Sequence, residues 1–172
     1  VAAPMFKKLS LELGGKNPNI IFADCDLDKA ISTSVHSSFA NQGQICLCGS
    51  RIFIERPIYE KFKTAFVEKV SRMKVGNPAD DTTKMGAIVS QSHMEKVLSY
   101  VDLAKDEGGT VLTGGNQALV DGECAEGWFI HPTIIEGLSF DCRTNQEEIF
   151  GPVVTIMPFD TEEEVLMMAN ST

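Results

Sequence analysis

The sequence predicts an α/β fold, a three-layer sandwich in which helices cover both faces of a mostly parallel sheet. Three observations predict it. Short apolar runs of the kind that form strands alternate with longer segments in which apolar residues recur every three or four positions. Gly, Pro, Ser and Asp separate the two kinds of segment. The 172 residues can bury one hydrophobic core, so residues 1–172 are expected to form a single domain.

Strands are predicted where apolar side chains alternate or cluster. Residues 9–13 alternate with period two and end at two glycines, so we expect them to form the first strand. The same reasoning predicts further strands at 20–22, 51–55, 110–113, 129–135 and 153–157. Residues 116–127 are polar and acidic and contain glycine, so a surface loop is expected there.

Helices are predicted between these strands. Asp26 offers an N-cap to a helix whose every fourth residue from 27 to 39 is apolar. Pro57 suits the start of the next helix. Two capping boxes predict later helix starts, at Ser92-x-x-Glu95 and Thr161-x-x-Glu164.

The composition excludes several classes of partner. A net charge of -9 argues against nucleic acid and anionic membranes, which are bound by Lys and Arg. No apolar run reaches the length that spans a bilayer. Five irregularly spaced cysteines do not form the pattern of a secreted disulfide framework, and no Cys/His set has metal-site spacing. We therefore expect no metal and reduced thiols in the cytoplasm, with the mitochondrial matrix as the alternative.

The two ends of the sequence lead us to expect an interrupted chain. It begins with Val1 without a signal-peptide pattern, and residues 169–172 follow a helical pattern without a stop signal. We expect a fragment of a longer protein; the alternative is a processed small protein with a ragged C-terminus.

Glu12 is the first candidate for chemistry. It faces the side of the predicted strand opposite Leu9, Leu11 and Leu13. If that face is buried, desolvation raises a glutamate pKa from about 4.3 toward neutrality, as a general base near pH 7 requires. If the face is exposed, Glu12 is an ordinary solvated side chain. The segment alone leaves both interpretations open.

Cys46 is the second candidate. Residues 41–50 join a predicted helix to a predicted strand, and such junctions often carry function. A thiol there is a nucleophile if its pKa falls below about 8.5, and loop N–H groups are available to stabilise an oxyanion. The alternative is that Cys46 and Cys48 are small buried hydrophobic residues.

The third candidate is the segment Glu147-Glu148-Ile149-Phe150 before Gly151 and Pro152. Adjacent carboxylates before a tight turn are able to bind sugar hydroxyls, and an aromatic ring is able to stack on a ligand. A charged turn at the start of a strand is the simpler interpretation, and the segment alone favours it.

Together, these segments resemble the aldehyde dehydrogenase superfamily. Residues 11–18 (LELGGKNP) look like its glutamate signature, 39–46 (FANQGQIC) like its cysteine signature and 147–153 (EEIFGPV) like a third landmark. They occur in the family's order, with Glu12 and Cys46 34 residues apart. Residues 39–48 and 7–10 look most like the 2-aminomuconic semialdehyde dehydrogenase subgroup.

The resemblance implies the family's catalytic-domain fold, a role for each candidate residue and a small-molecule aldehyde substrate. Cys46 would attack the aldehyde, giving a thiohemiacetal and then a thioester, and Glu12 would activate the water that hydrolyses it. Glu148 would bind the nicotinamide ribose of NAD or NADP, Phe150 would pack near the nicotinamide and the Leu13 carbonyl would contact the carboxamide. Cys48 departs from the alanine or threonine often found there and is given no role.

The resemblance also implies missing parts. The family's nucleotide-binding half, its oxyanion asparagine and its C-terminal segments match nothing in this sequence. We therefore expect the parent enzyme to be an NAD(P)-dependent aldehyde oxidoreductase and this chain alone to be inactive. Apolar surface next to the missing parts predicts a homo-oligomer.

Two other functions remain open. A structural or interaction protein would reuse the fold without the chemistry. A cysteine hydrolase of another fold would require a histidine near the thiol, and only His36 is close to Cys46 in the sequence.

Overall fold

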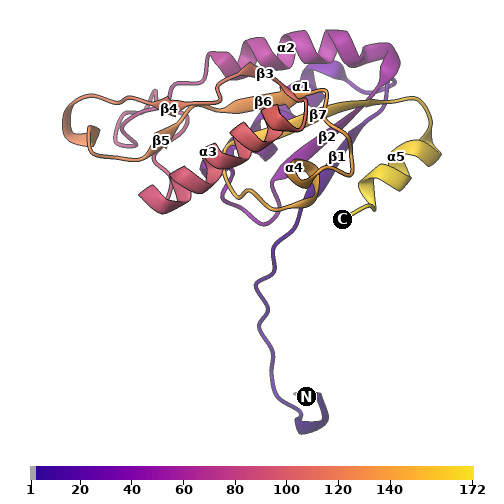
Figure 1. The fold of residues 1–172 in the computed structure, drawn as a ribbon, viewed down its shortest axis with the longest axis horizontal. Helices are drawn as coiled ribbons and strands as arrows, with labels where there is room; N and C mark the ends of the chain where they lie inside the picture. Colours follow the sequence, from indigo (N-terminus) through magenta and orange to yellow (C-terminus); the bar gives the residue numbers. More distant parts are fainter. Residues whose placement is uncertain (1–2) are drawn as a thin grey trace.

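A parallel sheet with one antiparallel edge strand forms the centre of the computed structural model, which describes residues 3–172 (Figure 1). Within those residues its strand order is β1-β2-β7-β6-β3. The parallel strands are β1 (Asn17–Ile21), β2 (Gly49–Glu55), β7 (Val153–Phe159) and β6 (Thr133–Glu136). Strand β3 (Thr110–Thr113) pairs with β6 in the antiparallel sense. The predicted mostly parallel sheet is confirmed.

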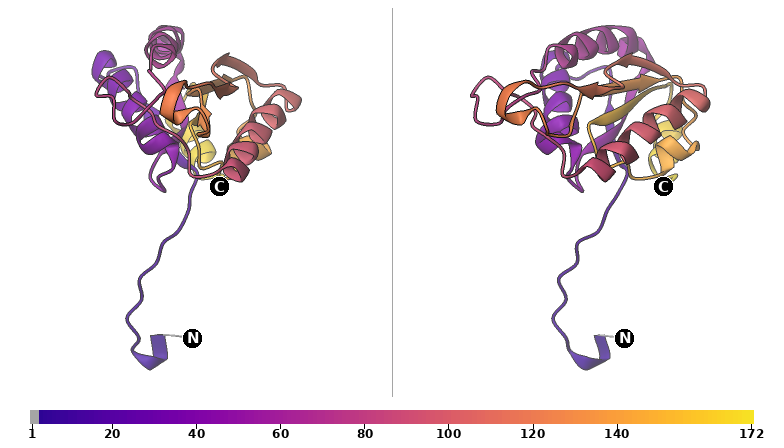
Figure 2. Two further views of the ribbon diagram at one scale, coloured as in Figure 1. Left: turned by 90° about the vertical axis from the view of Figure 1, so that its left-hand side faces the viewer. Right: turned by 60° about the vertical axis from the view of Figure 1, so that its left-hand side comes forward.

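Helices cover both faces of this sheet (Figure 2). Helices α1 (Leu27–Phe39) and α2 (Tyr59–Ser71) pack on one face. Helices α3 (Gln91–Asp106), α4 (Arg143–Gln146) and α5 (Glu162–Ala169) lie on the other. The three-layer α/β architecture is therefore confirmed.

The period-two pattern of β2 divides the core between the two faces. Ile52 and Ile54 join the cluster under α1 and α2, whereas Phe53 joins the cluster under α5. All three side chains are fully buried. A strand buried on both faces has a nearly continuous apolar sequence, as residues 52–54 do.

Side-chain caps fix where the helices begin. Asp26 accepts a hydrogen bond from the Lys29 N–H at 3.1 Å, and Thr161 accepts one from the Glu164 N–H at 3.2 Å, as predicted. The start predicted at Ser92 was wrong. Ser90 caps α3 by accepting from the His93 N–H, because Ser90 is the residue with extended backbone before the helix.

Residues 9–13 do not form the predicted strand. They have no partner strand within residues 3–172, and Leu9, Leu11 and Leu13 are 59 %, 67 % and 69 % exposed. The segment leaves the body of the molecule and projects away from it (Figures 1 and 2). Alternation in the sequence indicates which side chains share a face, but a strand forms only when its backbone N–H and C=O groups find a partner.

The strand predicted at 129–135 is two strands. Strand β5 (Phe129–Ile130) pairs with β4 (Gln117–Ala118), and β6 begins at Thr133. Pro132 lies between them and has no N–H to donate to a ladder. Residues 116–127, predicted to be a surface loop, also contain β4 and a short 3-10 helix, η4 (Gly122–Cys124).

No helix in residues 3–172 is both long enough and apolar enough to cross a membrane.

Candidate functional site

All five site residues predicted from the sequence line one open groove of about 360 Å³. Four segments of the sequence form it: residues 12–14, Cys46, the segment 147–153 and helix α3. The lining residues are Glu12, Leu13, Gly14, Cys46, His93, Lys96, Glu148 and Phe150. The fold therefore brings together residues that lie up to 138 positions apart (Glu12 and Phe150).

Cys46 lies in a hydrogen-bonded turn between α1 and β2. The turn is closed by the Cys48 N–H, which donates to the Ile45 carbonyl at 3.0 Å. Cys46 is half-buried, and within residues 3–172 its N–H donates to no protein acceptor. Cys46 therefore lines the groove with a backbone N–H that no described protein group engages.

A left-handed stretch of backbone precedes this turn. Asn41, Gln42 and Gly43 have φ angles of 48°, 58° and 69°. A Cβ on Gly43 would lie 2.2 Å from the Gly151 carbonyl oxygen, so this backbone packs directly on the third landmark. Such conformations cost free energy in residues with side chains and are typical of functional sites. The stretch fixes the path by which the chain enters the cysteine turn.

Cys48 faces away from the groove. It is 7 % exposed and lines a small internal cavity, and burial raises the pKa of its thiol. A buried, protonated thiol is a poor nucleophile. The structure thus separates the two cysteines, with Cys46 at the groove and Cys48 in the interior.

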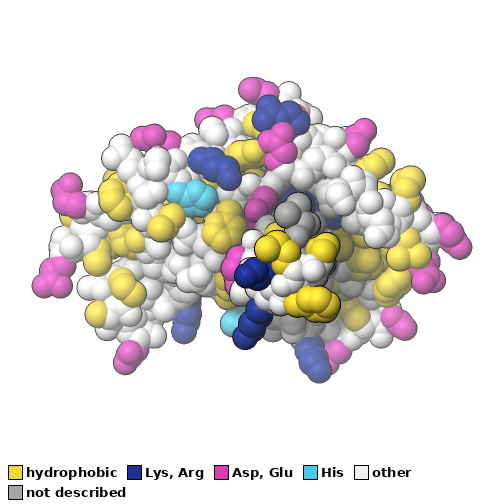
Figure 3. Space-filling view, turned by 90° about the horizontal axis from the view of Figure 1, so that it is seen from below, with side chains coloured by type: hydrophobic (Ala, Val, Ile, Leu, Met, Phe, Trp, Pro, Cys, Tyr) yellow, Lys and Arg dark blue, Asp and Glu magenta, His cyan; other side chains and the backbone are white. Residues whose placement is uncertain are grey.

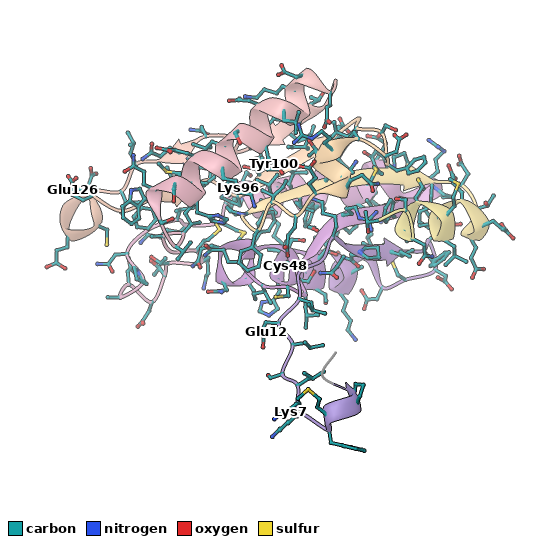
Figure 4. All side chains as sticks on the ribbon, turned by 60° about the horizontal axis from the view of Figure 1, so that its bottom comes forward. Lys7, Glu12, Cys48, Lys96, Tyr100 and Glu126 are labelled. Atoms are coloured by element: carbon teal, nitrogen blue, oxygen red, sulfur yellow. The ribbon has the colours of Figure 1, made fainter. Side chains whose placement is uncertain are left out.

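Glu12 lies in the groove, but the burial on which its expected activation depended is absent. The side chain is exposed, on the projecting segment where it approaches the body of the molecule (Figure 4). The predicted buried strand face is wrong for the same reason as the strand: no second strand covers residues 9–13 within the described chain. Leu13 also lines the groove and is exposed.

Glu148 is joined to the segment that carries Glu12. Its Oε1 accepts a hydrogen bond from the Gly15 N–H at 3.2 Å. A Cβ on Gly14 would lie 2.3 Å from Oε2, so a larger residue there would displace the Glu148 carboxylate from this position. Lys16, buried beside them, has its pKa lowered to about 8 by desolvation and by the charge of Arg51.

Phe150 has a left-handed backbone, with φ of 62°. Its carbonyl accepts a hydrogen bond from His93 Nε2 at 2.6 Å, so Nε2 carries the proton. The two rings meet edge to face, with centroids 6.2 Å apart. The neighbouring Glu148 carbonyl accepts from Lys96 Nζ at 3.1 Å. Helix α3 therefore holds the third landmark at two carbonyls.

His93 and Lys96 were not predicted as site residues. They lie one helical turn apart, and Figure 4 shows Lys96 on α3, together with Tyr100. The apolar pattern of α3 predicted its inward residues, and Met94 and Val97 are indeed buried. A histidine and a lysine at i, i+3 on the polar face were the available signal, but such a face usually meets only water. His36, the histidine closest to Cys46 in the sequence, lies in a different groove, between α1 and α2.

Fold and groove define an α/β protein with a cysteine at an open groove beside its sheet, and comparison with known proteins gives its family. The model of the aldehyde dehydrogenase family matches residues 1–172, and the chain belongs to that family. It is 51 % identical to 2-aminomuconic semialdehyde dehydrogenase of Danio rerio over 172 residues, which cover 99 % of this chain and 35 % of the relative. The corresponding protein of Pseudomonas sp. is 46 % identical over 171 residues, with the same coverage. The predicted resemblance to this subgroup is confirmed.

Solved structures give the same result for the fold. Betaine aldehyde dehydrogenase of Staphylococcus aureus in complex with NAD+ is 42 % identical, with a TM-score of 0.90. An aldehyde dehydrogenase variant from Bacillus cereus is also 42 % identical, with a TM-score of 0.91. Each match covers 99 % of this chain and 34 % of the solved chain. The chain thus spans about a third of the length of its relatives.

Proposed function

We propose that this chain supplies the nucleophile and the general base of an enzyme that oxidises a small-molecule aldehyde to a carboxylate with NAD or NADP. The observation that carries the proposal is the shared groove of Cys46, Glu12, Glu148 and Phe150. Relatives with similar sequences are semialdehyde dehydrogenases, and a structural neighbour was solved with NAD+.

The resemblance to the family supplies the proposed reaction, and the groove residues supply its groups. The Cys46 sulfur adds to the aldehyde carbon, and the carbonyl oxygen becomes an oxyanion that the Cys46 N–H is free to stabilise. Departure of hydride from that carbon leaves a thioester on Cys46. The Glu12 carboxylate takes a proton from water, which attacks the thioester and releases the carboxylic acid and the thiolate.

The groove fits the nicotinamide end of the cofactor. When bound, the oxidised nicotinamide supplies the acceptor for the hydride. One hydrogen bond from Gly15 leaves the Glu148 carboxylate with free acceptor sites for ribose hydroxyls. Phe150 and Leu13 both line the groove, where the Phe150 ring would offer an apolar wall and the Leu13 carbonyl would receive the carboxamide.

We propose that residues 1–172 form one catalytic domain, without the nucleotide-binding half, and that the chain alone does not oxidise aldehydes. The exposure of Glu12 supports this, because a general base works best when bulk solvent is excluded around it and the one reacting water is held in place. An activated ester such as p-nitrophenyl acetate requires the thiol but no oxidant, so it tests the nucleophile separately.

The test compares the unmutated 172-residue chain, called the parent chain below, with the variant Cys46→Ser. The variant Cys48→Ser is the matched control. We expect p-nitrophenyl acetate to acetylate Cys46, and the reaction to fall at least tenfold in Cys46→Ser and after iodoacetamide treatment. The control is expected to keep the rate. Equal rates in parent and Cys46→Ser would remove Cys46 as the nucleophile.

A non-catalytic scaffold is the second candidate function. The observation in its favour is the exposed, projecting segment that carries Glu12. The ester assay separates the two functions, because a scaffold gives no alkylation-sensitive rate. A cysteine hydrolase is less well supported, since His36 lies elsewhere and His93 Nε2 is engaged with the Phe150 carbonyl.

We further propose that the chain self-associates and resides in the cytoplasm or the mitochondrial matrix. Hydrophobic side chains gather on the projecting segment, seen end-on in Figure 3. The exposed residues of the segment include Met5, Phe6, Leu9, Leu11 and Leu13. Exposed apolar surface of this kind marks interfaces. All five cysteines are free thiols, in agreement with a reducing compartment.

A further inference from the structure

Asn17 joins the segment that carries Glu12 to the turn that carries Cys46. Its Nδ2 donates to the Cys46 carbonyl at 2.5 Å and to the Cys48 carbonyl at 3.2 Å. One amide group therefore bridges two carbonyls of the turn, at the point where β1 begins. None of the roles given above to the groove residues accounts for these bonds.

Local sequence explains why Asn17 reaches the turn. Pro18 follows it and restricts its backbone to the extended region. Asn17 pairs with Gly49 of β2, and the register shifts immediately after it, so its side chain lies beside the end of the cysteine turn. Its Oδ1 faces Gly15, where a Cβ would approach to 3.2 Å. The amide thus lies between Gly15 and the turn.

The direction of the Cys46 carbonyl decides which type of turn residues 45–48 form. In the turn 45–48, the peptide between Cys46 and Leu47 is the central one. Type I and type II turns differ mainly in the orientation of this central peptide. Leu47 is not among the described residues with positive φ, as a type II turn would require. A donor at the Cys46 carbonyl stabilises the observed orientation against the flipped one.

We propose that Asn17 is a positioning residue: its amide holds the Cys46 and Cys48 carbonyls, ties the cysteine turn to the start of β1 and thereby fixes the position of Cys46 in the groove. It acts through the turn and does not touch the reacting atoms. Loss of both hydrogen bonds is expected to change the turn populations about tenfold, which corresponds to about 1.4 kcal/mol. The functional consequence rests on the proposed role of Cys46; the structural consequence does not.

The experiment uses variants that add no volume. Asn17→Ala removes both hydrogen bonds, and Asn17→Ser keeps one donor. Asn19→Ala is the matched control, because Asn19 lies on the same strand and its Nδ2 donates to Ser34 Oγ at 2.9 Å, away from the turn. The first readout is amide hydrogen exchange at Cys48, whose N–H closes the turn. The second is acetylation of Cys46 by p-nitrophenyl acetate, located by peptide mass.

We expect Asn17→Ala to accelerate Cys48 exchange about tenfold and to slow Cys46 acetylation by a similar factor. Asn17→Ser is expected to recover part of both effects, and Asn19→Ala to show neither. If the backbone amides of β2 also exchange rapidly in Asn17→Ala, that variant has unfolded. The variants Asn17→Ser and Asn19→Ser are then compared with each other in the same two readouts, with a smaller expected effect.

Cys48 exchange within twofold of the parent in Asn17→Ala would overturn the proposal. So would an equal effect in Asn19→Ala, or no recovery in Asn17→Ser. A parent chain whose Cys46 is never acetylated would instead count against the proposed function, and the exchange comparison would still decide the role of Asn17.

Discussion

The two candidate catalytic groups are held in very different ways. Cys46 lies in a closed turn that Asn17 connects to β1 by a hydrogen bond. The backbone that leads into this turn packs on Gly151 at Gly43. Glu12 lies on an exposed segment without a partner strand within residues 3–172. The described chain therefore builds the surroundings of Cys46 from its own contacts. The segment that carries Glu12 is held only from Gly15 onward, where the Gly15 N–H donates to Glu148.

The chain passes from an exposed residue to a buried one within four positions, between Glu12 and Lys16. Glu12 is exposed, whereas Lys16 is 6 % exposed and accepts a hydrogen bond at its carbonyl from the buried Arg51 guanidinium at 2.9 Å. The contacts of residues 14–17 thus mark the boundary between the ordered site and the projecting segment. Three predictions test this comparison.

The largest effect is expected at Gly43, on the cysteine side. Gly43→Ala should lower the free energy of unfolding by about 3 kcal/mol, because its Cβ would overlap the Gly151 carbonyl and its φ is positive. Gly122→Ala is the control: its φ is 73°, and nothing lies within 4 Å of the added Cβ, so backbone strain alone should cost about 1 kcal/mol. Urea unfolding measures both. Equal losses in the two variants would show that the packing of the turn on Gly151 contributes nothing.

The next effect concerns Lys16, at the boundary. Its pKa is about 8 in the folded chain and 10.5 in the unfolded chain, so between these pH values the unfolded chain binds an additional proton. Stability should therefore rise as the pH increases from about 8 to about 10.5. Below pH 8, Lys16→Met should be more stable than the unmutated chain by about 3 kcal/mol, and the difference should vanish above pH 10.5.

Lys29→Met, at an exposed site on α1, is the control for this titration. It should follow the parent across the same pH range in urea unfolding. A difference between Lys16→Met and the parent that does not change with pH would mean that desolvation of the Lys16 charge is not its cause.

The sequence predicted the layers of the fold because its helices and parallel strands are buried in patterns that show in local periodicity. The stripe at 27–39 and the apolar run 52–54 are examples, and both lie in the core as expected. The segment 9–13 has an equally clear pattern, yet it forms no strand. Pairing depends on a partner, and no local pattern carries that information.

The residues of the candidate site also fall into those that the sequence predicted and those that it did not. Local pattern singled out Glu12, Cys46 and the segment with Glu148 and Phe150, resemblance to the family gave them roles and added Leu13, and the structure places all five residues in one groove. Spacing alone had left the alternatives open. His93, Lys96 and Asn17 were missed because their partners are backbone carbonyls far away in the sequence. Hydrogen bonds of this kind depend on the tertiary arrangement and leave no periodic signal.

The smallest effect on stability is expected for the projecting segment itself. Removal of residues 1–11 should change the free energy of unfolding by less than about 0.5 kcal/mol, because the side chains from Met5 to Leu11 are exposed and contribute little to the core. The same removal should shift a concentration-dependent sedimentation profile toward the monomer, since it deletes Met5, Phe6, Leu9 and Leu11. A matched variant, Leu9→Ser with Leu11→Ser, keeps the length and should have the same effect. Unchanged self-association in both would place the interface elsewhere, and a large loss of stability would mean that the segment packs on the body and that Glu12 is held as firmly as Cys46.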